Sequence, residues 1–119
     1  MKSALILYIG VLALTIGVVL GEVKPPRVYV YTRYPMKFGE PNELICHCTD
    51  FHPPRIDIKL KHDRIEYENC QKTDMTFKED WAYYQTASVP FTPKEGVKYS
   101  CDVSHNEGPM KSYVLDTSM

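Results

Sequence analysis

The sequence lacks the residue patterns that usually accompany catalysis. It has no glycine-rich phosphate loop, no nucleophile elbow, and no Ser-His-Asp or Cys-His arrangement that would predict a nucleophilic enzyme. It also lacks an excess of either charge, since 14 basic and 15 acidic residues give a net charge of −1. A strongly basic surface for nucleic acid is therefore excluded. We predict a protein that is not an enzyme, uses no cofactor and binds no nucleic acid.

Long hydrophobic runs and helical periodicity are also missing, except at the start of the chain. Residues 4–20 form an uncharged apolar run between Lys2 and the small residue Gly21. This pattern is typical of a signal peptide, so we predict that residues 1–21 are removed and that residues 22–119 form one domain in an oxidising, extracellular compartment. Alternatively, the run is kept as a membrane anchor, and the protein is a single-domain cell-surface receptor or adhesion module.

The sequence does contain short runs in which apolar and polar residues alternate. Tyr99, Cys101, Val103 and His105 alternate with polar residues, which predicts a strand with one buried face. Similar runs occur at residues 27–34, 44–49, 56–61, 81–91 and 110–115. One or two short edge strands are expected between residues 65 and 75. About seven strands at this spacing predict an all-β antiparallel sandwich.

The cysteines suggest how the two sheets are joined. A tyrosine two residues before a cysteine, as in Tyr99 and Cys101, is the corner signature of an immunoglobulin sandwich. That fold needs a second cysteine about half a domain upstream, where Cys46 lies, so we predict a Cys46–Cys101 inter-sheet disulfide. Four cysteines allow three pairings. A Cys48–Cys70 bridge is an alternative for the other two, but their strands would not be neighbours. We therefore expect a buried free thiol at Cys48 and leave Cys70 unassigned.

The histidines near these cysteines have a metal-binding and a structural interpretation. The run Cys46-His47-Cys48 could contribute metal ligands, but in a strand His47 faces away from both cysteines. No second Cys/His pair follows at the spacing of a zinc site, so we predict no metal. His105 lies on the buried face of its strand, where we expect a structural hydrogen bond.

Four runs are specific enough to indicate a family. They are Val30-Tyr31-Thr32-Arg33-Tyr34-Pro35, Phe51-His52-Pro53, Phe77-Lys78-Glu79-Asp80-Trp81, and Phe91-Thr92-Pro93 leading to Tyr99-Ser100-Cys101. Together they resemble the beta-2-microglobulin family, the light chains of class I histocompatibility molecules, over nearly all of residues 22–119. Leu60 supports the resemblance, because the family also has leucine where most immunoglobulin domains have tryptophan. Cys48 and Cys70 are additional to the family pattern.

The resemblance implies a seven-stranded immunoglobulin domain of the C1 type that acts by binding. In the family, such a chain binds noncovalently to a membrane-bound class I heavy chain and stabilises it for peptide antigen presentation. It is secreted, and is at the cell surface when bound. The family also keeps the peptide bond before Pro53 cis. The positions that match its heavy-chain-binding residues are Tyr31 and Arg33 on the first strand, His52 in the loop after the second, Asp74, Phe77 and Trp81 around the later turn, and Tyr84 on the strand after it.

Overall fold

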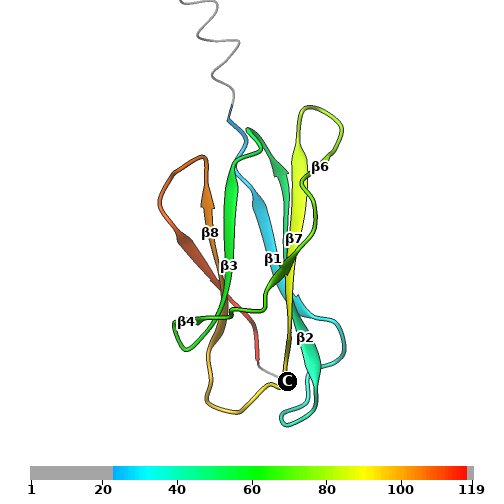
Figure 1. The fold of residues 1–119 in the computed structure, drawn as a ribbon, viewed down its shortest axis with the longest axis vertical. Helices are drawn as coiled ribbons and strands as arrows, with labels where there is room; N and C mark the ends of the chain where they lie inside the picture. The colour runs from blue at the N-terminus through cyan, green and yellow to red at the C-terminus, as the bar shows by residue number, and fades with distance from the viewer. Residues whose placement is uncertain (1–22, 118–119) are drawn as a thin grey trace, which may run out of the picture.

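A computed structural model describes residues 23–117, so the predicted signal peptide lies outside the described residues and its removal stays a prediction. The chain folds into two antiparallel sheets that pack face to face (Figure 1). One sheet contains, in order, β1 (Arg27–Thr32), β2 (Asn42–Phe51), β7 (Tyr83–Phe91) and β5 (Gln71–Lys72), with β6 (Thr76–Phe77) also paired to β7. The other contains β4 (Ile65–Glu66), β3 (Ile56–His62), β8 (Tyr99–His105) and β9 (Lys111–Val114).

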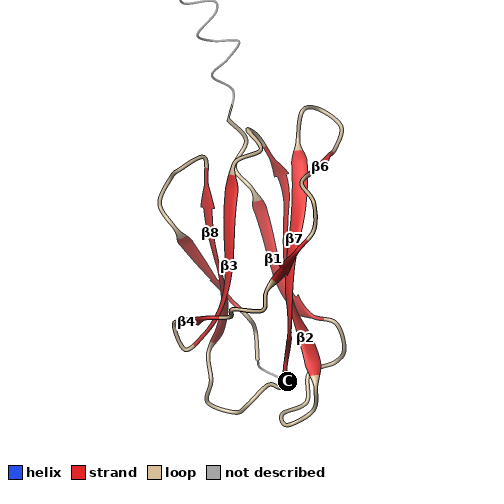
Figure 2. Ribbon diagram, viewed as in Figure 1, coloured by secondary structure: helices blue, strands red, loops and turns tan. Residues whose placement is uncertain are grey.

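All regular structure in residues 23–117 is strand, as Figure 2 shows, which confirms the predicted all-β class. Consistently, this part of the chain includes no helix of the length and apolar character needed to cross a membrane. The alternation in the sequence explains the strands. In β2, for example, Leu44, Cys46 and Cys48 are fully buried, whereas Ile45 and His47 between them are only partly buried. Successive side chains therefore point alternately into the core and out of it.

The core is joined across the two sheets by the Cys46–Cys101 disulfide, with a sulfur–sulfur distance of 2.05 Å. This confirms the predicted pairing. Cys48 is a fully buried free thiol, and burial raises its pKa to about 12. Cys70 is also free and partly buried. Leu60 lies opposite Cys101 in the β3–β8 register and is fully buried, so leucine occupies the place beside the disulfide.

Two predicted details of the core are present. The Tyr99 hydroxyl accepts a hydrogen bond from the Lys94 backbone N–H at 2.9 Å, which closes the tyrosine corner. The Tyr99 ring also packs edge-on against Phe91, with centroids 4.9 Å apart. The His105 Nε2 atom lies 3.0 Å from the Pro53 carbonyl oxygen, which is the expected structural hydrogen bond.

The strand ends differ from the prediction in one informative place. The strand expected at residues 81–91 begins at Tyr83, because Asp80 and Trp81 both have positive φ angles, 59° and 60°. Such angles belong to the left-handed region and cannot continue a strand. Residues 78–82 therefore form a turn, called the Trp81 turn below. In residues 23–117, six longer strands are accompanied by three of two residues each, β4, β5 and β6.

Candidate binding surface

The outer face of the β1–β2–β7 sheet carries aromatic side chains in neighbouring rows. Tyr29 and Tyr31 on β1 remain 51% and 45% exposed, because the alternation that packs the partly buried Val28 and Val30 against the core turns the tyrosines outwards. Tyr29 is paired with His47 on β2. This sheet therefore presents aromatic surface to solvent instead of the charged surface usual for an exposed sheet face.

Two further predicted residues lie near this face: Tyr84 is on β7, and Arg33, expected on the first strand, instead directly follows the end of β1 at Thr32. The Arg33 guanidinium donates a hydrogen bond to the Glu43 carboxylate at 3.1 Å, and this hydrogen bond raises the pKa of Arg33 above its ordinary value. The Arg33 side chain is still 60% exposed, so part of its guanidinium remains accessible to a partner. On β7, the Tyr84 ring lies 5.9 Å from the ring of His47. Sequence reasoning placed both Arg33 and Tyr84 on this face.

His47 belongs to the same face but was considered in the sequence only as a metal ligand. Its Nδ1 atom lies 2.7 Å from the Thr86 hydroxyl, which orients the imidazole beside Tyr84. The strand alternation already indicated that His47 faces outwards, and that signal could have identified His47 as part of this surface. Among the described residues, no group of three or more His, Cys, Asp or Glu side chains is arranged to hold a metal ion.

A second group of aromatic residues lies at the end of the sandwich that contains the Trp81 turn, at the top of Figure 1. Trp81 is 72% exposed and Phe77 is 55% exposed, and their ring centroids are 6.1 Å apart. Phe77 in turn packs edge-on against Tyr83 at 5.4 Å, and Tyr83 stacks on His52 at 6.2 Å. The four rings form a continuous aromatic row from the turn to the loop after β2.

Tyr83 was not among the residues predicted for this site. It lies on the inward side of β7, paired with Phe51, yet it connects Phe77 to His52 because it is at the strand end. The sequence shows adjacent tyrosines, Tyr83 and Tyr84, but gives no signal that the inward one reaches the end of the sandwich. That placement depends on the packing of three separate segments.

His52 and Asp74 occupy loops near this end of the sheet. The His52 backbone pairs with Lys24 through two hydrogen bonds of 2.8 and 3.0 Å, and the His52–Pro53 peptide bond is cis, as predicted. The His52 Nδ1 atom is buried without a hydrogen-bond partner. Asp74 is exposed in the loop between β5 and β6, where its backbone carbonyl accepts a hydrogen bond from the Thr76 hydroxyl at 3.2 Å.

The Trp81 turn is closed by its own backbone. The Lys78 N–H donates to the Ala82 carbonyl oxygen at 2.6 Å, and the Ala82 N–H donates to the Glu79 carbonyl oxygen at 3.3 Å. A non-glycine residue in the left-handed region costs about 1–3 kcal/mol. The turn contains two in succession, Asp80 and Trp81. It therefore needs support from its surroundings, and it leaves the indole of Trp81 in solvent.

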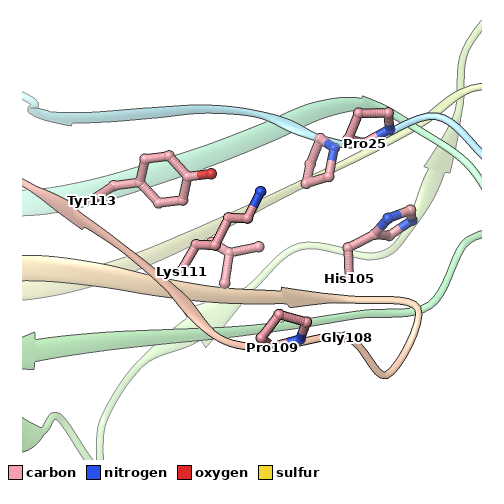
Figure 3. A pocket seen from close by; sticks show the side chains of 8 residues that line it. Pro25, His105, Gly108, Pro109, Lys111 and Tyr113 are labelled. Atoms are coloured by element: carbon pink, nitrogen blue, oxygen red, sulfur yellow. The ribbon is translucent and has the colours of Figure 1, made fainter.

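A separate hollow of about 190 Å³ lies between the N-terminal segment and the β8–β9 hairpin (Figure 3). Pro25, His105, Pro109, Lys111 and Tyr113 are among the residues that line it. It is smaller than the roughly 300–1,000 Å³ usual for small-molecule sites. The exposed aromatic surfaces, and not this hollow, are therefore the stronger candidates for function.

The comparison with known proteins agrees with this architecture. Residues 28–108 match the immunoglobulin C1-set domain family. The two sheets, the disulfide between them and the tyrosine corner define the same class, an immunoglobulin domain of the C1 set. The chain is 42% identical to a beta-2-microglobulin of Xenopus laevis over 116 residues, which cover 98% of each chain.

Other relatives extend the match across vertebrates. The chain is 48% identical to a beta-2-microglobulin of Paralichthys olivaceus over 91 residues, covering 76% of this chain and 78% of the relative. It is 37% identical to one of Rattus norvegicus over 104 residues, covering 87% and 86%. The chain belongs to the beta-2-microglobulin family. This membership points to a protein that is not an enzyme.

Proposed function

We propose that this protein is the light chain of a class I histocompatibility molecule. It binds noncovalently to a membrane-bound heavy chain and stabilises that chain for peptide antigen presentation. The protein is secreted, and it is held at the cell surface through the heavy chain. The observation that carries the proposal is the exposure of Trp81, at 72%, in a chain that belongs to the beta-2-microglobulin family.

The composition of the surface supports a protein partner. Tyrosine, tryptophan and arginine are enriched in interface cores, and tryptophan is the residue type most typical of binding hot spots. Tyr31, Arg33 and Tyr84 would contact the heavy chain through the sheet face. Phe77 and Trp81 would contact the underside of its peptide-binding platform, with His52 and Asp74 at the margin. A partner that covers these exposed rings would remove their apolar surface from water.

The mechanism is stabilisation by mass action. A light chain that binds only the folded heavy chain raises the free energy of unfolding of that chain, by an amount that grows with light-chain concentration. No covalent step is needed. The structural role of the domain is then to hold a rigid aromatic surface, and its own disulfide-linked core supplies the rigidity.

The test is Trp81→Ala. Because Trp81 is largely exposed, its loss should change the free energy of unfolding of the isolated chain by no more than about 0.5 kcal/mol. Loss of a hot-spot tryptophan costs about 2 kcal/mol or more in binding, which corresponds to roughly a 30-fold weaker affinity. The measurement is the dissociation constant with a refolded class I heavy chain and peptide.

The matched control is Ile65→Ala, which removes an apolar side chain of similar exposure, 60%, from β4 in the other sheet. It should leave the heavy-chain affinity unchanged. Equal affinity of wild type and Trp81→Ala would count against the proposal.

A further inference from the structure

Lys78 begins the Trp81 turn, and its side chain reaches across to β2. Its Nζ atom donates a hydrogen bond to Asp50 Oδ1 at 2.8 Å and lies 3.5 Å from the Thr49 hydroxyl. On the other side, Arg27 Nε of β1 is 3.8 Å from Asp50 Oδ2. The carboxylate of Asp50 is therefore shared between a cation from the turn and a cation from the first strand. The hydrogen bond from Lys78 lowers the pKa of Asp50, so this group is ionised at neutral pH.

Asp50 occupies an unusual backbone position. The register of β2 and β7 shifts between Cys48 and Phe51, which leaves one extra residue in β2 and makes a β-bulge. Asp50 lies in this bulge with a φ angle of 62°. Bulges redirect a side chain away from its regular strand direction, and aspartate tolerates the left-handed region better than most residues. The local backbone thus places a carboxylate where the ammonium of Lys78 can reach it.

A second lysine also supports the turn. The Lys24 Nζ atom donates to the Asp80 carbonyl oxygen at 2.8 Å, while the Lys24 backbone is itself paired with His52. Asp80 and Trp81 are the two left-handed residues of the turn. Such a conformation persists only when its surroundings determine it. The side chains of Lys78 and Lys24 connect this turn to β2 and to the N-terminal segment, in addition to the ring contact between Trp81 and Phe77.

We propose that Asp50 and Lys78 form a positioning pair, which holds the Trp81 turn in its binding arrangement before a heavy chain arrives. This inference rests on the proposed function. Neither residue needs to touch the partner, and neither was among the residues predicted to bind it. A turn that is already ordered loses less conformational entropy on binding, so the pair raises affinity indirectly. Exposed ion pairs are weak, so the expected effect is about threefold to fivefold in an equilibrium constant.

The experiment compares Asp50→Asn with wild type. Asparagine keeps the size of the side chain and also tolerates a positive φ, so the change removes the charge without straining the bulge. The first measurement is hydrogen exchange of the Lys78 and Ala82 amides in the isolated chain, because both amides are hydrogen-bonded within the turn. We expect exchange about threefold to fivefold faster in Asp50→Asn. The second measurement is affinity for the heavy chain, which should fall by a similar factor, while the equilibrium constant for global unfolding rises by no more than that factor and the domain stays folded.

Two further variants and one control make the result specific. Lys78→Met removes the ammonium but keeps the length of the side chain, and it should reproduce both effects. Lys78→Arg keeps the charge and should retain wild-type exchange and affinity. Asp57→Asn is the matched control, because it also removes one carboxylate that is paired with two cations. The Asp57 carboxylate oxygens lie 3.9 Å from the Nζ atoms of Lys59 and Lys72. Because Asp57 lies on β3, in the other sheet, neither measurement should change.

The outcomes separate this inference from the proposed function. Unchanged exchange in Asp50→Asn and Lys78→Met overturns the inference, because the pair then does not hold the turn. Faster exchange with unchanged affinity also overturns it, because binding then does not depend on the order of the turn. A wild-type chain that binds no class I heavy chain overturns the proposed function and the binding half of the inference, while the exchange measurement still decides whether the pair holds the turn.

Discussion

The buried thiol of Cys48 allows a quantitative test of the core. Cys48 is fully buried in the same core as the disulfide, and burial raises its pKa to about 12. The thiolate is the form that reacts with alkylating reagents. In a variant with Cys70→Ser, Cys48 is the remaining free thiol, provided that Cys46 and Cys101 are paired as in the structure. Its alkylation rate in the folded chain therefore reports directly on its environment.

The expected size of the effect follows from the pKa. At pH 8, a thiol with a pKa of about 12 is ionised in about one molecule in 10,000, whereas an ordinary thiol with a pKa of about 8.5 is ionised in about one in four. Ionisation alone therefore slows the reaction of Cys48 more than a thousandfold. Burial slows it further, because the reagent reaches the sulfur only when the domain opens.

The assay is alkylation at pH 8 followed by intact mass measurement over time. The Cys70→Ser chain should remain unlabelled when folded and take up one label quickly in denaturant. A companion Cys48→Ala chain should be labelled faster when folded, because Cys70 is only partly buried. Labelling of folded Cys70→Ser at a rate within tenfold of the denatured chain would refute the reasoning. A wild-type chain without free thiols would show instead that Cys48 and Cys70 are bridged.

Two further predictions concern stability. Tyr99→Phe removes the oxygen that accepts the Lys94 N–H, and an unpaired donor in this partly buried corner should cost about 1–3 kcal/mol in urea unfolding; an unchanged midpoint would contradict the tyrosine corner. Asp102→Asn should destabilise the domain at pH 7 but make little difference near pH 2. Burial alone would raise the pKa of Asp102, but the hydrogen bond from Lys61, at 2.8 Å, lowers it overall. The stability that this carboxylate contributes is therefore complete above about pH 5 and is lost as the pH falls below the ordinary value of about 3.9. If the difference in unfolding free energy between variant and wild type stayed constant from pH 7 to pH 2, the Asp102 carboxylate would not contribute stability in this way.

Much of the fold could be predicted because its signals are local. The strand at residues 99–105 was predicted with its observed limits, since its alternation is strict and turn residues flank it. The disulfide followed from Tyr99 and Cys101 once the sandwich was recognised. The edge strands were less distinct because each contains only two residues, too few for a period to show. Pairing with a neighbour, and not local preference, decides where they form.

The candidate site could be predicted only in part. The outward direction of Tyr31 follows from its strand, and the family resemblance drew attention to Trp81. The ion pair of Asp50 with Lys78 had no such signal, because the two residues are 28 positions apart and belong to unrelated segments. The left-handed angle of Trp81 was equally hidden, since tryptophan does not favour it, even though the preceding Asp80 tolerates it.

By itself, the amino-acid sequence determined which side chains form the core, which strands carry them and which cysteines join the sheets, because alternation and spacing are properties of the chain alone. Only the tertiary structure decided how the Trp81 turn is held and which rings meet at the end of the sandwich. The turn depends on lysines and a carboxylate from distant segments, and the aromatic row depends on three segments packing together. Those contacts exist only after the two sheets have closed on each other.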